Sequence, residues 1–184
     1  MPFIHIVPIQ VISPVDFDPL KEIIYKTFNI QPVISNLKIN ISDTYDPKRN
    51  QYYSSKILIK LQEIKPDNGI KIIGITEFDL FIPILTFVFG EAQLNGPAST
   101  ISLFRLKNQF YGLPEDNRLL SERINKETIH ELGHNFGLFH CHDYSCVMKS
   151  STYVEDIDIK TISLCTSCKN LLLKSKILKA SPPS

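Results

Sequence analysis

The stretch HELGHNFGLFH, residues 130–140, places three histidines and one glutamate at separations that decide what the rest of the chain must support. On a helix, His130 and His134 lie one turn apart on nearly the same face, so both imidazoles can bind one cation. Glu131 projects about 100° around the helix from His130, close enough to orient a water on that cation without ligating it. The spacing therefore predicts a helix that presents two metal ligands and a base.

His140 can join this site only if the helix does not run straight on. Ten residues past His130, a continuous helix would carry it about 15 Å along the axis and onto another face. Glycine adopts the left-handed conformation that ends helices, so we predict that the chain bends at Gly137 and returns His140 to the metal. Three neutral imidazoles around zinc leave a fourth position for water, which is the open coordination of a catalytic site.

The extended pattern HExxHxxGxxH makes metal binding the firmest inference, because a shorter HExxH arises in helices by accident. Catalysis is the next step. In an active site, zinc lowers the pKa of a water and polarises the scissile carbonyl, while Glu131 takes the proton and passes it to the leaving amine. This chemistry is hydrolysis of a peptide bond, with a peptide or protein as substrate.

The four cysteines form a second candidate site. Cys141 and Cys146 are separated by four residues, and Cys165 and Cys168 by two, which are ligand spacings of structural zinc. Disulfides and a redox-active CxxC are the alternatives. The segment MPFIHIVPIQVIS lacks the features of a signal peptide, so we expect a cytoplasmic protein with reduced thiols. Two zinc ions are predicted, one catalytic and one structural, joined by the peptide bond between His140 and Cys141.

Composition limits the classes of partner. The 184 residues fit one domain, and 43% hydrophobic with 21% charged residues is typical of a soluble globular protein. No apolar run reaches the length of a membrane span. A formal net charge of +1 gives no electrostatic case for nucleic acid or an anionic membrane, and we expect a monomer.

The hydrophobic periodicity predicts an α/β protein of three layers with a mixed sheet. Strands or extended segments are expected at residues 4–12, at or near a sheet edge because of Pro8, and at 33–41, 70–75, 85–89 and 98–106. Helices are expected from Pro19 and over residues 49–64, 118–138 and 166–178.

The motif followed by Met148 resembles the metzincins, and HELGHNFGLFHCHDYSCVM with CTSC at 165–168 resembles the archaemetzincins within that clan. The match covers residues 128–168. The resemblance implies a metzincin-like zincin fold with an active-site helix and a small, zinc-stabilised C-terminal subdomain. It also implies that Met148 forms the turn beneath the metal. By the same resemblance, Glu131 is the base, catalytic zinc is bound by His130, His134 and His140, and structural zinc is bound by Cys141, Cys146, Cys165 and Cys168.

The length predicts a single catalytic domain over residues 1–184, and the composition of residues 180–184 predicts a disordered tail. The resemblance further implies that the upper part of this domain runs to about 137 and that its lower part covers about 138–180. A substrate cleft would lie between the two parts, along the edge strand of the sheet. Two other functions remain open: a two-zinc binding or regulatory protein with little or no proteolysis, and a four-cysteine module that contacts nucleic acid, against which the neutral charge speaks.

Overall fold

A five-stranded mixed sheet, in the order β2–β1–β5–β8–β7, forms the centre of the molecule. The structure, a computed structural model, describes residues 2–11 and 15–180, with side chains to 175. The strands are β1 (Phe3–Ile9), β2 (Gln31–Ile34), β5 (Gly69–Thr76), β7 (Gly90–Ala92) and β8 (Ala98–Ser102). All neighbours are parallel except β7 and β8, so β7 is an antiparallel edge strand.

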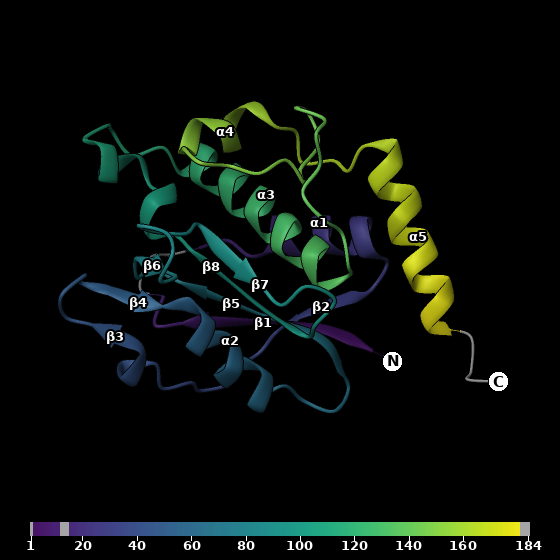
Figure 1. Ribbon diagram of the computed structural model, residues 1–184, viewed down its shortest axis with the longest axis horizontal. Coiled ribbons are helices and arrows are strands. Elements are labelled where there is room, and N and C mark those ends of the chain that lie inside the picture. Colours follow the sequence, from purple (N-terminus) through teal and green to yellow (C-terminus); the bar gives the residue numbers. More distant parts are fainter. Residues whose placement is uncertain (1, 12–14, 181–184) are drawn as a thin grey trace.

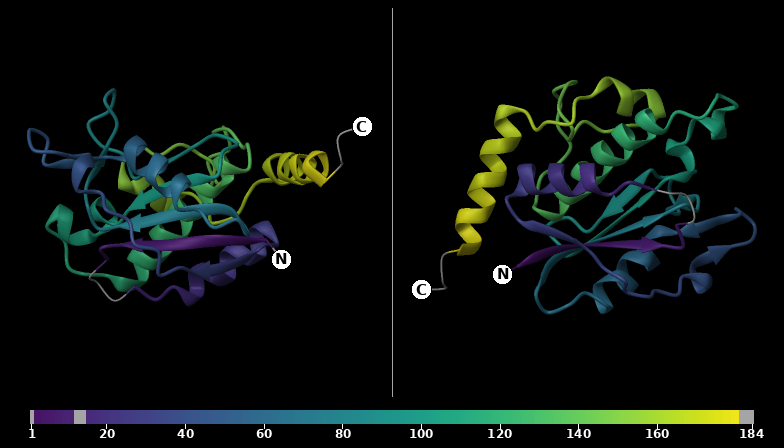
Figure 2. Two further views of the ribbon diagram at one scale, coloured as in Figure 1. Left: turned by 90° about the horizontal axis from the view of Figure 1, so that it is seen from below. Right: turned by 180° about the vertical axis from the view of Figure 1, so that it is seen from behind.

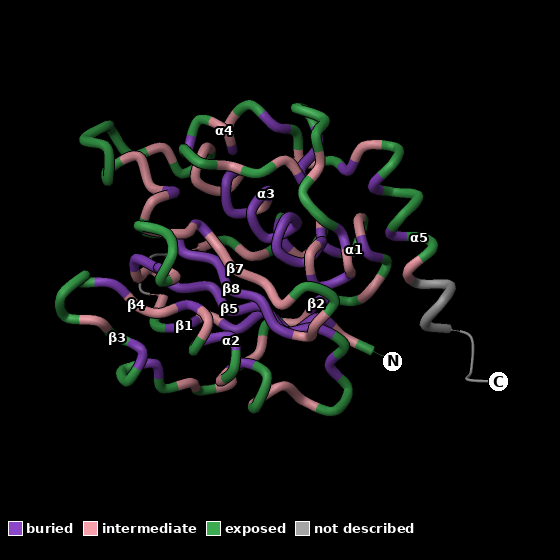
Figure 3. The backbone as a smooth tube through the Cα atoms, in the orientation of Figure 1, coloured by how far each residue is buried: buried purple, intermediate pink, exposed green. Residues whose placement is uncertain are grey.

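Helices cover both faces of this sheet and give three layers (Figures 1 and 2). Helix α2 (Ser54–Glu63) packs Ile57, Leu58 and Leu61 against one face. Helices α1 (Asp18–Phe28) and α3 (Asn117–Asn135) cover the other face, where the larger apolar cluster lies. The backbone is most buried along α3 and the central strands (Figure 3).

Helix α3 is buried on most of its surface from Arg123 onward because it lies between the sheet and the C-terminal segment. Asp116 caps its N-terminus: the Asp116 carboxylate accepts a hydrogen bond from the Leu119 N–H at 2.8 Å. After α3 come two further helices, α4 (Val154–Ile159) and α5 (Thr166–Ala180). None of the described helices is both long and apolar enough to cross a membrane.

A second, small sheet lies beside the first one, in the order β3–β4–β6. Its strands are β3 (Tyr45–Asp46), β4 (Gln51–Tyr53) and β6 (Leu80–Phe81). Single 3₁₀ turns complete the fold: η1 (Ser42–Thr44), η2 (Phe104–Leu106) and η3 (Asn108–Tyr111). These pieces lie on the side of the molecule where β7 begins, next to the carboxyl ends of β5 and β8 (Figure 1).

The α/β class, the mixed sheet and the four longer helices agree with the sequence prediction. Strand β1 lies second from the edge, and Pro8 is accommodated because β2 pairs only with residues 3–6 of β1. The strand stops at Ile9, before the predicted end at residue 12, and residue 12 itself lies outside the described residues. The predicted tail begins at the last residue of α5, and its remainder also lies outside them.

Several predicted boundaries are wrong. The second strand ends at Ile34, so most of the segment predicted to 41 is irregular. The helix predicted from residue 49 begins at Ser54, because residues 51–53 pair in the small sheet instead. The extended segment at 85–89 contributes only an isolated bridge between Val88 and Leu80, and strand β8 ends at Ser102. Helix α4 was not predicted.

Candidate active site

Three imidazoles converge at the C-terminal end of α3. The Nε2 atoms of His130 and His134 lie 3.1 Å apart, and the His140 ring centroid lies 5.3 Å and 4.9 Å from theirs. The Nδ1 N–H of His130 donates to the Val147 carbonyl at 2.8 Å, and that of His134 donates to the Leu138 carbonyl at 2.7 Å. Because these bonds occupy Nδ1, each Nε2 lone pair is directed at the shared centre.

The three rings fit the requirements of a zinc site. One nitrogen from each lies within 4.8 Å of the others, as ligands around a single ion must. Burial lowers the pKa of His134 and His140 and lowers that of His130 furthest, so the neutral form that binds metal is favoured. His140 is the exposed member of the set, so the centre opens to solvent on its side.

The bend that brings His140 to the other two is the one predicted at Gly137, which has φ +91°. The Gly137 N–H donates to the His134 carbonyl and the Leu138 N–H donates to the Gly133 carbonyl, which is the Schellman arrangement at a helix end. Lys71, a buried lysine of β5, donates to the Asn135 carbonyl at 2.7 Å and so satisfies another terminal carbonyl of α3. The sequence analysis missed this lysine.

Glu131 lies buried on α3 against the edge strand β7. A Cβ atom on Gly90 of β7 would lie 2.7 Å from both Cγ and Oε1 of Glu131, so only glycine leaves room for the carboxylate. Burial raises the pKa of Glu131 well above its ordinary value, and the nearby Glu127 carboxylate adds to that rise, whereas Lys160 opposes it. The result is a desolvated carboxylate beside the three imidazoles.

A Gly90→Ala variant is expected to bind zinc at the histidines and to lose about 10²-fold in kcat/KM, because the new methyl group displaces the Glu131 carboxylate. Peptide hydrolysis and zinc content measured on the same preparation check this. The matched control is Ala92→Gly, which changes the same strand without adding an atom beside Glu131. Full activity in Gly90→Ala would show that the observed position of Glu131 is not needed.

Met148 lies beneath the histidine site and is completely buried. Its side chain contacts α3 at Gly133, where a Cβ atom would overlap the methionine sulfur. The Cys141 N–H donates to the Met148 carbonyl at 2.9 Å, so the loop that carries the third histidine is bonded to this turn. Met148 was predicted as the turn methionine, but the need for glycine at position 133 was not foreseen.

The four cysteines come together in the C-terminal segment, as their spacing predicted. One sulfur from each lies within 4.8 Å of the others, the Sγ atoms of Cys141 and Cys165 are 3.7 Å apart, and all four thiols are free. Burial raises the pKa of Cys146 and Cys168, whereas the Cys168 N–H lowers that of Cys165. Four converging sulfurs suit a closed, tetrahedral zinc site rather than two separate disulfides.

A cavity of about 270 Å³ opens between β7 and the segment after Met148. One wall is the chain leading into β7, the floor is α3, and the opposite wall is residues 150–152, which we call the wall segment. His130 and His140 of the histidine centre line this cavity, together with Glu131. The lining residues on α3 and beyond it are Glu127, His130, Glu131, His140, Ser150, Ser151 and Thr152.

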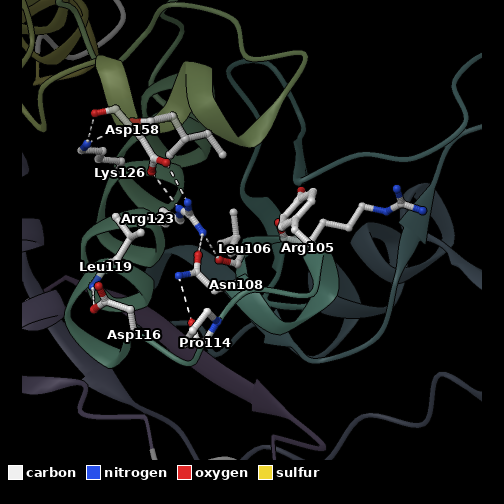
Figure 4. Close-up of polar contacts among 11 residues, drawn as sticks. Arg105, Leu106, Asn108, Pro114, Asp116, Leu119, Arg123, Lys126 and Asp158 are labelled. Atoms are coloured by element: carbon white, nitrogen blue, oxygen red, sulfur yellow. Dashed lines mark hydrogen bonds and ion pairs between the residues drawn. The ribbon is translucent and has the colours of Figure 1, made fainter.

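Charged side chains of α3, none of them singled out in the sequence, attach the C-terminal segment to the active-site helix. The Arg123 guanidinium donates two hydrogen bonds of 2.7 Å to the Asp158 carboxylate and one to the Leu106 carbonyl (Figure 4). Lys126 donates to the carbonyls of Ile157 and Asp158 at 3.0 and 3.1 Å. These bonds join residues that are far apart in the sequence, so local spacing did not predict them.

Comparison with known proteins agrees with this geometry. Residues 16–174 match the model of Peptidase family M54. Archaemetzincin of Pyrococcus furiosus is 43% identical over 150 residues, which cover 80% of this chain and 78% of that protein. Archaemetzincin of Methanocaldococcus jannaschii is 38% identical over 149 residues, 81% of this chain and 80% of that protein.

Two crystal structures have the same fold. Archaemetzincin of Methanopyrus kandleri superposes with a TM-score of 0.86 at 30% identity and covers 96% of both chains. A zinc-dependent peptidase of Methanocorpusculum labreanum gives 0.80 at 31% identity, over 92% of this chain and 99% of that one. The chain therefore belongs to peptidase family M54 and is a zinc metallopeptidase.

Proposed function

We propose that this chain hydrolyses peptide bonds at a zinc ion held by His130, His134 and His140, with Glu131 as the general base. The observation that carries the proposal is the convergence of three imidazoles beside a buried carboxylate. Backbone carbonyls orient two of those imidazoles. Zinc bound there supplies a Lewis acid that activates water and polarises the peptide carbonyl.

The chain's own residues supply the proton transfers and the alignment. Glu131 accepts a proton from the attacking water and returns it to the departing amine, and desolvation strengthens the carboxylate as a base. Gly90 leaves room for the Glu131 carboxylate, and both residues line the cavity. Gly137 and Met148 fix the position of His140 and the floor of the site.

The substrate is a peptide or protein, and we propose that it binds in an extended conformation along β7. This strand is the edge of the mixed sheet and lies directly beside Glu131. An extended peptide can add to such an edge through backbone hydrogen bonds, while one side chain enters the cavity of about 270 Å³. β7 is thus our candidate for the edge strand that the resemblance implied without locating.

We also propose a structural zinc at Cys141, Cys146, Cys165 and Cys168. This metal would stabilise a lower part of about residues 138–180 beneath an upper part that ends at about 137, within one catalytic domain. The free, converging thiols support it. We further propose that the protein is a cytoplasmic monomer, since its thiols are free. Its near-zero net charge supports the proposal that it binds neither nucleic acid nor membrane.

The test is metal analysis followed by incubation with a mixed peptide library. Two zinc ions per chain are expected, together with cleavage that stops on chelation by phenanthroline and returns when zinc is added. Two zinc ions without metal-dependent cleavage would favour the regulatory alternative. Fewer than two would overturn the structural zinc.

A further inference from the structure

Lys160 is a completely buried lysine at the end of α4, and its ammonium group has two partners on different segments. It donates to the Glu127 carboxylate on α3 at 2.9 Å and to the Lys149 carbonyl at 3.3 Å. Glu127 lies one helical turn before Glu131 and lines the cavity. Lys160 itself does not line the cavity, so its influence passes through these partners.

The Lys149 carbonyl lies at the start of the wall segment, residues 150–152. At the other end of that segment, the Asp156 carboxylate accepts hydrogen bonds from the N–H groups of Thr152 and Tyr153 at 2.8 and 2.9 Å. The wall segment is therefore held at both ends, by Lys160 on one side and by Asp156 on the other. Lys160 also ties its end directly to the helix that carries Glu131.

Burial of the lysine carries an energetic cost that the pair must offset. A buried ammonium group needs both a counter-ion and hydrogen-bond acceptors, and an apolar pair of similar size is often equally stable. The particular contribution of this lysine is geometric, because its bonds fix the distance between α3 and the wall segment. Lys126 is also buried against α4, but among the described residues its hydrogen bonds go to the Ile157 and Asp158 carbonyls, outside the wall segment.

We propose that Lys160 is a positioning residue that sets the width of the substrate cavity by holding the wall segment to Glu127 on the active-site helix. The proposal rests on the peptidase activity proposed above and deepens it. Lys160 contacts no substrate. It governs how well a substrate side chain is bound between β7 and the wall segment, rather than the chemistry at the histidines.

The test compares Lys160→Met with the double variant Lys160→Met/Glu127→Gln. The single variant leaves a buried, unpaired carboxylate and is expected to lower the Tm by roughly 10 °C and to raise KM about tenfold. The double variant removes that charge, so the Tm is expected to recover. KM is expected to stay raised, because the Lys149 carbonyl still lacks its hydrogen bond from Lys160. Return of both Tm and KM to the wild-type values would show that Lys160 only stabilises the fold and would overturn the proposal.

Lys126→Met is the matched control. This substitution removes the hydrogen bonds from a buried lysine on α3 to carbonyls of α4 and leaves the contacts of the wall segment unchanged. The KM of this variant is therefore expected to match the wild type even if its Tm falls. A rise in KM equal to that of Lys160→Met would make the effect one of general loosening, and the proposal would fail.

Two further measurements do not depend on turnover. Amide hydrogen exchange should accelerate at residues 149–153 in Lys160→Met and in the double variant, but not in Lys126→Met.

The second measurement is inhibitor affinity. In Lys160→Met, affinity for a peptidyl hydroxamate should fall about tenfold, while affinity for acetohydroxamate, which reports the metal alone, stays constant. If the wild type binds hydroxamates but cleaves no peptide, the peptidase proposal fails, whereas the hydrogen-exchange comparison still tests whether Lys160 positions the wall segment. Unchanged amide exchange at residues 149–153 in Lys160→Met would overturn that positioning role.

Discussion

A Glu131→Gln variant is expected to retain zinc at the histidines and to lose about 10² to 10⁴-fold in kcat. The amide has the shape of the carboxylate and fits beside Gly90, but it cannot accept the proton from the attacking water. Zinc binding should persist because the three imidazoles and the carbonyls that orient His130 and His134 are untouched. Steady-state hydrolysis of one cleaved peptide, with zinc measured on the same sample, checks both parts.

Glu127→Gln separates this effect from a loss of charge near the metal. Glu127 is the neighbouring carboxylate on the same face of α3, yet it is paired with Lys160, and the atoms nearest to a Cβ on Gly90 belong to Glu131 instead. The amide still accepts the lysine hydrogen bond, so Glu127→Gln should lose far less turnover than Glu131→Gln. Normal peptide hydrolysis by Glu131→Gln would remove Glu131 from the mechanism.

A Cys168→Ser variant is expected to lose the metal of the cysteine cluster and to weaken zinc at the histidines as well. Cys168 is buried, and removing one thiolate from a tetrahedral site forfeits most of its metal affinity. We expect destabilisation beyond about 4 kcal/mol and a melting temperature lower by roughly 10 °C or more. Differential scanning calorimetry and zinc titration measure these two effects.

The histidine site and the cysteine cluster are coupled because adjacent residues of the chain belong to them. Cys141 directly follows His140 and its N–H is bonded to the Met148 carbonyl, so disorder in the cluster frees the third histidine. Ser167→Ala, an exposed position between two of the cysteines, is the control and should change neither property. Unchanged zinc affinity at the histidines of Cys168→Ser would show that the two sites are independent.

The features predicted well from the sequence are those set by local spacing. One helical turn separates His130 from His134, and a glycine is needed where the chain reverses, so α3 and its bend follow from eleven consecutive residues. The cysteine pairs carry the same kind of information, because each pair is close in the chain. Fold class follows from the alternation of apolar strands and amphipathic helices.

The features that were missed depend on long-range register. The role of Gly90 is evident only once β7 is placed against Glu131, and residues 51–53 become a strand only by pairing with β3 and β6. Lys160 and Glu127 are 33 positions apart in the chain, so neither signals the other. In a sequence without three-dimensional contacts, such side chains resemble solvated charges.

The two carbonyls that orient the imidazoles of His130 and His134 also point to an order of events in folding. His134 is bonded to Leu138, four residues away, so its orientation is set as soon as the helix and its bend form. His130 is bonded to Val147, 17 residues away, and can be oriented only after the C-terminal segment has docked. We therefore expect the His134 ring to be oriented before the His130 ring, and the three proposed zinc ligands to be complete only once the C-terminal segment has docked on α3.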